Sequence, residues 1–149
     1  MSNLRDRLVS ATLSWQERFG ITPRITDAVA EFDAAMIIGM SHDEYSIAMR
    51  GRTAVSRGHD FAFRGIRYQV KANRPSGSKG SKVTLVSKAK NYDWDVLIWL
   101  LYNREYVLIE AWAWDVSEYR TAFGDVSRIN PAHMRNGRTA IQPPEPSGN

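Results

Sequence analysis

Apolar and polar positions alternate along the chain in patterns that predict four helices, a hairpin and two further strands. In residues 3–19 the apolar side chains recur every three or four positions, which predicts an amphipathic helix that ends at Gly20. Capping residues and the same periodicity predict a second helix over residues 22–39, opened by threonine and proline, and a third over 41–50. The apolar row of the first helix, expected to pack in the core or against a second copy, is Leu4, Leu8, Ala11, Trp15 and Phe19.

Residues 59–74 have the strict alternation of a β-hairpin. The turn is expected at Arg64 and Gly65, because glycine adopts the positive φ that a two-residue turn requires. Counting outward from that turn places Asp60 directly across from Gln69, with Lys71 on the same face. An acid, an amide and an amine therefore share the polar face of the hairpin.

Two apolar runs follow the basic loop of residues 75–82. Residues 95–102 are almost continuously apolar, which predicts a central strand covered on both faces, and residues 106–114 are expected to return beside it as an antiparallel strand. In the second run, alternation places Leu108 on the same face as Glu110, a carboxylate held in reserve as a metal ligand. A short helix is expected from 115 to 121.

The resulting order predicts one α/β domain with a central mixed β-sheet flanked by helices. We place the domain at residues 1–142, with the N-terminal helices in 3–51 and the hairpin and sheet core in 58–122. The polar segment after Gly124 is expected to be irregular and able to touch a ligand. The proline-rich end, 143–149, is a disordered tail by composition.

Charge is unevenly distributed around a net value of +4. Residues 50–90 contain eleven Lys and Arg against one acid, Asp60, and the rest of the chain is acidic. A basic centre predicts a polyanionic partner, although a solvated lysine-rich loop would give the same composition. The residues expected to contact nucleic acid are Arg52, Arg57, Arg64, Arg67, Arg74, Lys79, Lys82 and Lys88.

Several other classes of site are excluded. With no cysteine and three scattered histidines, a zinc site is not expected, and the glycines of residues 77–82 lack the spacing of a phosphate-binding P-loop. The apolar runs are too short to span a bilayer, so we expect a soluble cytoplasmic protein with no membrane partner.

The polar face of the hairpin suggests metal chemistry. Asp60, the Gln69 amide and the Val70 carbonyl are hard oxygen ligands, which suit Mg²⁺ or Mn²⁺. Lys71 would stabilise developing negative charge or help to position a water. Glu31, on the second predicted helix, is either a surface charge or an acid directed at this face.

Asp60, the Gln69–Lys71 run and the upstream Glu31 together resemble the PD-(D/E)xK nuclease superfamily in its Q-x-K variant, as in Mrr-like and other restriction-endonuclease-like domains. The resemblance implies a restriction-endonuclease-like core, a catalytic set of Asp60, Gln69, Lys71 and Glu31, and a metal held by Asp60, Gln69, Val70 and Glu31. Gln69 stands where the family usually has an acid.

The sequence therefore predicts a Mg²⁺- or Mn²⁺-dependent DNA endonuclease of the restriction type. We expect a homodimer, because one site in a small domain cuts only one strand of a duplex. Two alternatives stay open. The first is a junction resolvase or repair nuclease, and the second is a DNA-binding module with the nuclease fold whose catalysis has decayed.

Overall fold

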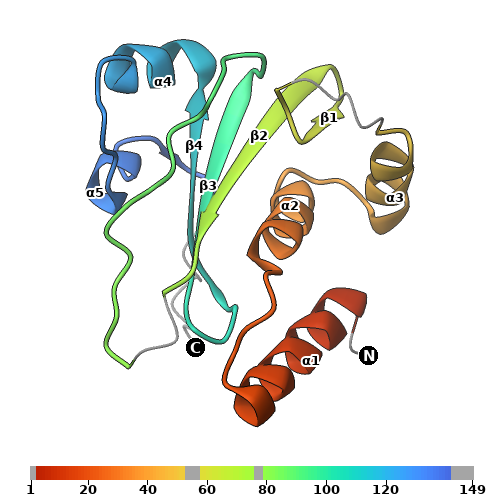
Figure 1. The fold of residues 1–149 in the computed structure, drawn as a ribbon. Helices are drawn as coiled ribbons and strands as arrows, with labels where there is room; N and C mark the ends of the chain where they lie inside the picture. The colour runs from red at the N-terminus through yellow and green to blue at the C-terminus, as the bar shows by residue number, and fades with distance from the viewer. Residues whose placement is uncertain (1–2, 53–57, 76–78, 142–149) are drawn as a thin grey trace, which may run out of the picture.

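The computed structural model of the chain describes residues 3–52, 58–75 and 79–141, and it contains a five-stranded sheet with helices on both faces (Figure 1). The strands lie side by side in chain order. β2 and β3 are parallel, and each other neighbouring pair is antiparallel. The expected α/β class with a central mixed sheet is thus confirmed. The elements are α1 (Leu4–Phe19), α2 (Thr26–Ile37), α3 (His42–Arg50), β1 (Phe61–Phe63), β2 (Ile66–Asn73), β3 (Val96–Tyr102), β4 (Leu108–Asp115), α4 (Val116–Phe123), α5 (Pro131–Met134) and β5 (Arg138–Thr139).

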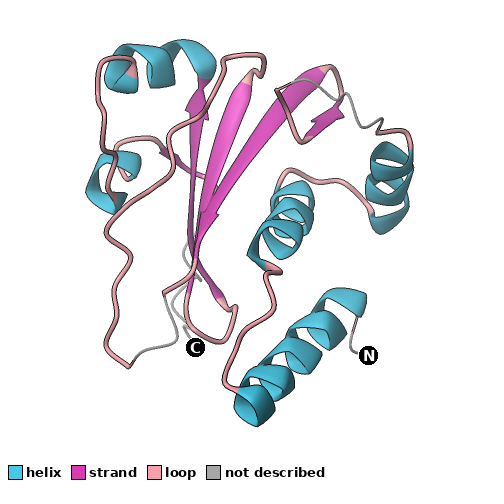
Figure 2. Ribbon diagram, in the orientation of Figure 1, coloured by secondary structure: helices cyan, strands magenta, loops and turns pink. Residues whose placement is uncertain are grey.

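Helices and loops cover both faces of the sheet (Figure 2), and each face carries an apolar core. On one face, α2 and α3 lie over a cluster that includes Tyr68, Ile98 and Leu100. On the other face, α4, α5 and the loop of residues 79–95 enclose a cluster around Trp99. β3 contributes side chains to both clusters, so it is the doubly covered central strand that its apolar run predicts.

The hairpin has the predicted turn and register. Arg64 and Gly65 have φ values of 50° and 79°, the paired left-handed conformation of a two-residue hairpin turn. Phe61 pairs with Tyr68 as the last pair of the ladder, and Asp60 is the residue before β1, with its backbone N–H donating to the carbonyl of the same Tyr68. Turn chemistry and alternation act between near neighbours, which is why the sequence determines this element.

Two helix boundaries are also confirmed. α1 ends at Gly20, which adopts the left-handed conformation with φ 78°. α3 begins with a complete capping box, in which the Ser41 hydroxyl accepts from the Glu44 backbone N–H and the Glu44 carboxylate accepts from the Ser41 N–H. Each cap satisfies backbone groups that the helix itself leaves unpaired.

The predicted apolar face of α1 does not face the core. Trp15 and Phe19 are 53% and 58% exposed, whereas Val9 and Thr12 on a neighbouring face are buried. The exposed Leu4 and Leu8 belong to the same row. The expectation of core packing for this row is therefore wrong, because the orientation of α1 is set by contacts with distant residues.

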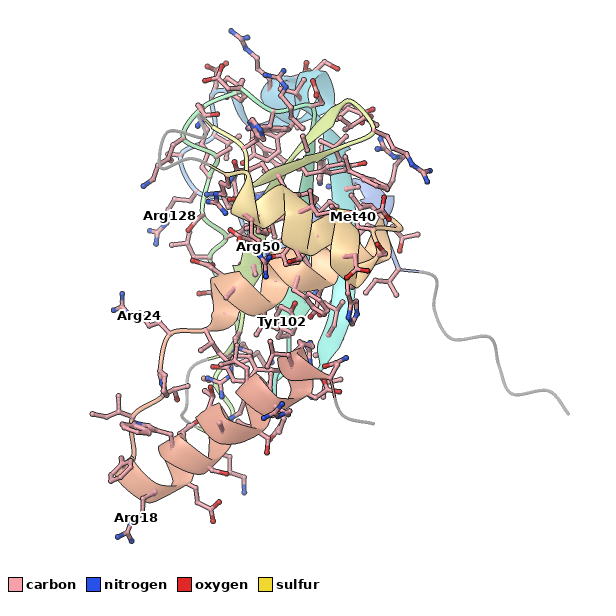
Figure 3. All side chains as sticks on the ribbon, turned by 90° about the vertical axis from the view of Figure 1, so that its right-hand side faces the viewer. Arg18, Arg24, Met40, Arg50, Tyr102 and Arg128 are labelled. Carbon is pink, nitrogen blue, oxygen red and sulfur yellow. The ribbon has the colours of Figure 1, made fainter. Side chains whose placement is uncertain are left out.

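The contact that orients α1 is an ion pair with α2. The Arg5 guanidinium donates to both carboxylate oxygens of Asp33, each at 2.9 Å, and to the Tyr106 carbonyl at 2.9 Å. The Tyr102 hydroxyl donates to the same carboxylate at 2.6 Å, and Figure 3 shows Tyr102 between α1 and α2. Both charged side chains are mostly buried, so the pair ties α1 to the body of the protein.

α2 begins later than predicted. Thr22 and Pro23 lie before the helix, in the connection between α1 and α2, and α2 starts at Thr26. The preceding Ile25 gives no side-chain cap. The residues of α2 that are most deeply buried are small, which lets the helix lie close against the sheet, and they are Val29, Ala30, Ala34 and Ala35.

A β-bulge changes the face of Leu108. The pairing of β3 with β4 shifts so that Leu101 lies opposite Glu110 and Tyr102 lies opposite Leu108, which leaves Ile109 as the extra residue. Leu108 therefore packs with the α2 core, and Ile109 is exposed. The prediction that Leu108 shares a face with Glu110 is wrong for this reason.

The segment after Gly124 is ordered by its own contacts. Asn130 caps α5, Met134 is buried, and β5 pairs with β4. Arg135 and Arg138 donate to acids of the sheet edge and of α4 rather than facing outward as free cations. The expectation of an irregular segment is therefore wrong. The predicted tail, 143–149, lies outside the described residues.

Candidate functional site

The end of the hairpin ladder positions Asp60. Its backbone N–H donates to the Tyr68 carbonyl at 2.8 Å, which extends the pairing of β1 with β2 by one bond. One of its carboxylate oxygens accepts from the Val70 N–H at 2.7 Å. The carboxylate thus takes the place of a further strand residue at the edge of β2. Since the N–H and C=O of a strand residue point to the same side, the Val70 carbonyl faces this edge as well.

α2 brings a second carboxylate to the same place. Glu31 lies close enough to Asp60 for a hydrogen bond between the two carboxyl groups when one is protonated. Burial and then the negative charge of Asp60 raise the pKa of Glu31 to about 7. The Glu31 carboxyl therefore exchanges its proton near neutral pH. Between the two interpretations of Glu31, the structure supports the acid directed at the hairpin.

A polar cavity of about 230 Å³ joins these groups. It contains the five residues that the sequence singles out as catalytic or metal-binding. Lys71 comes from the same strand as Gln69, two positions on, and therefore lies on the same face of β2. The lining residues are Asp27, Glu31, Asp60, Gln69, Val70, Lys71, Ala72 and Ser87.

The donor set of this cavity fits a hard divalent cation. Besides the acid Asp27, its lining offers the Glu31 and Asp60 carboxylates, the Gln69 amide oxygen and the Val70 carbonyl, which are oxygen ligands of the kind that Mg²⁺ and Mn²⁺ prefer. A cation between Glu31 and Asp60 would oppose the two causes that raise the Glu31 pKa, which are burial and then the negative charge of Asp60. Within residues 3–52, 58–75 and 79–141 no three His, Cys, Asp or Glu side chains group as a metal site, so the amide and the carbonyl would have to complete the ligand set.

Arg52 follows α3 and supplies a positive charge at the rim. Its guanidinium lies 3.4 Å from a Glu31 carboxylate oxygen, and the Arg52 side chain is 36% exposed. Such a long and partly exposed ion pair contributes little to stability, so it can exchange partners at small free-energy cost. Arg52 is expected from sequence as a nucleic-acid contact, and its pairing with Glu31 is not.

Three neighbours of the site are not predicted from the sequence. Asp27 lies one helical turn before Glu31, a spacing of four that could have identified it. Tyr45 of α3 is near enough that burial, followed by the charge of Glu31, raises its pKa to about 12. Ser87 enters from the loop after β2, and no local pattern marks it.

The predicted nucleic-acid contacts differ in their exposure and in their partners. Arg64, Lys79 and Lys82 are exposed, and Arg67 is exposed but paired with Asp95. Arg57 lies outside the described residues.

Two of the remaining predicted contacts have partners inside the fold. Arg74 donates to the Arg104 carbonyl and to Gln16, and its guanidinium lies 4.2 Å from the centre of the Tyr106 ring. Lys88 donates to the carbonyls of Gly124 and Val126. Both side chains therefore have structural roles that the local sequence does not indicate.

Glu110, the reserve metal ligand, is held elsewhere. It accepts from Arg135 at 2.7 and 2.8 Å and from the Trp112 indole at 2.9 Å. The hydrogen bond from Arg135 lowers the pKa of Glu110. It is not among the residues that line the polar cavity, so the structure gives no support to a metal-binding role.

Comparison with protein-family models and with curated proteins finds no match for this chain. None of the helices within the described ranges is long and apolar enough to cross a membrane.

Proposed function

We propose that this chain is a divalent-metal-dependent endonuclease of the PD-(D/E)xK kind, with a restriction-endonuclease-like core and DNA as its substrate. One observation carries the proposal. Two carboxylates from different elements, Glu31 and Asp60, share a polar cavity with Gln69 and Lys71. The basic residues of the central part of the chain support a polyanionic substrate.

Asp60, Glu31, the Gln69 amide and the Val70 carbonyl would hold the metal. Mg²⁺ or Mn²⁺, when bound there, polarises a phosphate oxygen and favours ionisation of a water. Lys71 places an ammonium group beside the reacting phosphate, where it stabilises the negative charge that develops as the phosphodiester is cleaved. The Val70 N–H fixes the Asp60 carboxylate, so this ligand is preorganised before substrate arrives.

Plasmid cleavage tests this assignment. The wild-type chain with Mg²⁺ or Mn²⁺ should nick or linearise plasmid DNA, and Lys71→Ala or Asp60→Ala should reduce the rate at least about 100-fold. Arg18→Ala is the control for Lys71→Ala, because it removes one positive charge from the far end of α1 (Figure 3). Cleavage that survives either site substitution would refute the assigned residues. Structured junctions in place of plasmid would distinguish a resolvase or repair nuclease.

The second candidate function is DNA binding without catalysis. It is favoured by Gln69, an amide where a third carboxylate would hold the metal more tightly. Calorimetric titration with Mg²⁺ or Mn²⁺ separates the two, because the binding module would take up no metal with or without DNA. Its affinity for DNA would still fall with salt, by about 0.9 log units per log unit of salt for each phosphate neutralised.

We also propose a homodimer, since a single site acts on one strand at a time. The exposed apolar side chains Leu4, Leu8, Trp15 and Phe19 of α1 support this proposal, because monomers rarely leave such a row in water. Light scattering at micromolar concentration, with and without duplex DNA, measures the oligomeric state. A monomer under both conditions would refute it.

A further inference from the structure

A second cavity adjoins the candidate site at Asp60. It has a volume of about 280 Å³ and lies between the end of α3 and the start of β1. Asp60 is the one residue that lines both this cavity and the site cavity among their described linings. A ligand bound at Asp60 can therefore extend from the site into the second cavity.

The chemistry of the second cavity suits an anion. Apart from Asp60, its charged or titratable lining side chains are Arg52 and His59. The rest of the described lining is apolar or backbone, from Ile47, Ala48, Gly51, Phe61 and Ala62.

Arg52 connects the two cavities. It lines the second cavity, and its guanidinium makes the 3.4 Å contact with Glu31 of the first. A cation bound by Glu31 would compete with Arg52 for the same carboxylate. Arg52 would then be available to an anion in the second cavity, and the binding of cation and anion would support each other.

We infer that the second cavity is a subsite for a phosphate that neighbours the scissile phosphate on the same strand, bound by Arg52 and His59. This inference rests on the proposed function, and it adds the direction in which the strand crosses the site, from the Lys71 side past Asp60 to the end of α3. Arg52 exchanges its contact with Glu31 for the phosphate when the site is loaded. Arginine suits this exchange because its guanidinium pairs with carboxylate and phosphate in the same planar geometry.

The first experiment measures the phosphate contact without requiring cleavage. The affinity for a short DNA duplex is measured as a function of salt concentration, with Ca²⁺ as the divalent cation. The chains compared are the wild type, Arg52→Ala, His59→Ala and Arg50→Ala. Arg50→Ala is the matched control, since Arg50 is exposed at the end of α3, two positions before Arg52, and lines a different cavity. Loss of one phosphate contact should reduce the salt slope by about 0.9 in Arg52→Ala, and Arg50→Ala should keep the wild-type slope.

The second experiment places the contact next to the cleaved bond. Once the cleaved position is mapped, single neutral methylphosphonates are introduced at the phosphates on either side of it. We expect one of these positions to slow wild-type cleavage by about 10–100-fold, and Arg52→Ala and His59→Ala to be insensitive to the same change. Arg52→Lys keeps the charge, so it should keep the salt slope and shows whether the fold tolerates substitution here.

The outcomes separate the inference from the proposed function. If the Arg52→Ala and His59→Ala slopes equal that of Arg50→Ala, or if both variants stay as sensitive to methylphosphonate as the wild type, the subsite is refuted. If the slopes fall but the wild type cleaves no DNA with Mg²⁺ or Mn²⁺, the phosphate contact stands and the nuclease proposal fails.

Discussion

Glu31→Gln should make the protein more stable at pH 8, although it removes an ion pair. The Glu31 carboxyl has its pKa raised from the ordinary 4.5 to about 7 by burial and by Asp60. In the folded chain it keeps a proton that the unfolded chain releases near pH 4.5. The folded state thus binds more protons across this window, so the free energy of unfolding falls as pH rises from about 4.5 to 7.

The interval between the two pKa values sets the size of the effect. At about 1.4 kcal/mol for each tenfold change in proton affinity, the ceiling is about 3 kcal/mol. Water reaches the pair, and screening reduces the ceiling to roughly 1–2 kcal/mol. Glu31→Gln also removes the contact with Arg52, and this loss reduces the expected stabilisation by less than about 1 kcal/mol, because the contact is long and partly exposed.

Urea unfolding at pH 5 and pH 8 measures the prediction. From pH 5 to pH 8 the free energy of unfolding should fall by roughly 1–2 kcal/mol more in the wild type than in Glu31→Gln. At pH 8 the variant should be the more stable of the two. Glu17→Gln, at an exposed position of α1, is the control and should follow the wild type. Mg²⁺ should recover more stability in the wild type than in Glu31→Gln. Equal pH dependence in the two chains, or a less stable variant at pH 8, would refute the reasoning.

Two further predictions follow from the contacts. Gln69→Glu adds a carboxylate to the cavity and should tighten Mg²⁺ binding by about tenfold or more, measured by calorimetry; unchanged or weaker binding would show that Gln69 is not a ligand. Asp33→Ala leaves the mostly buried Arg5 without its carboxylate and should lower the free energy of unfolding by about 3 kcal/mol in urea, whereas a loss under about 1 kcal/mol would show that the ion pair does not hold α1.

The outcome for the candidate site shows which contacts a sequence can predict. The register of β1 with β2 follows from the turn at Arg64 and Gly65, and so the hairpin that carries Asp60 and Gln69 is predictable. The position of Glu31 depends on how α2 packs on the sheet, and its helical periodicity allows a surface role equally well. Arg52 lies 21 positions from its partner Glu31, and no local signal indicates that pairing.

The elements that could be predicted correctly are those with local causes. Alternation, turn stereochemistry and capping act within a few residues, and they defined the hairpin, the capping box of α3 and the central strand β3. Long-range contacts set which face of α1 is buried, since Val9 and Leu13 pack in the core and Arg5 pairs with Asp33, while the apolar row of Trp15 and Phe19 stays exposed.

Tertiary structure also decided which charges are available for function. Arg74, Lys88 and Glu110 resemble ligand-binding residues in the sequence, and each has partners far along the chain. Glu31 resembles a surface acid, and packing of α2 brings it to Asp60. Long-range packing sets the distance between such charges and their exposure to water, and these two quantities control the strength of their interaction.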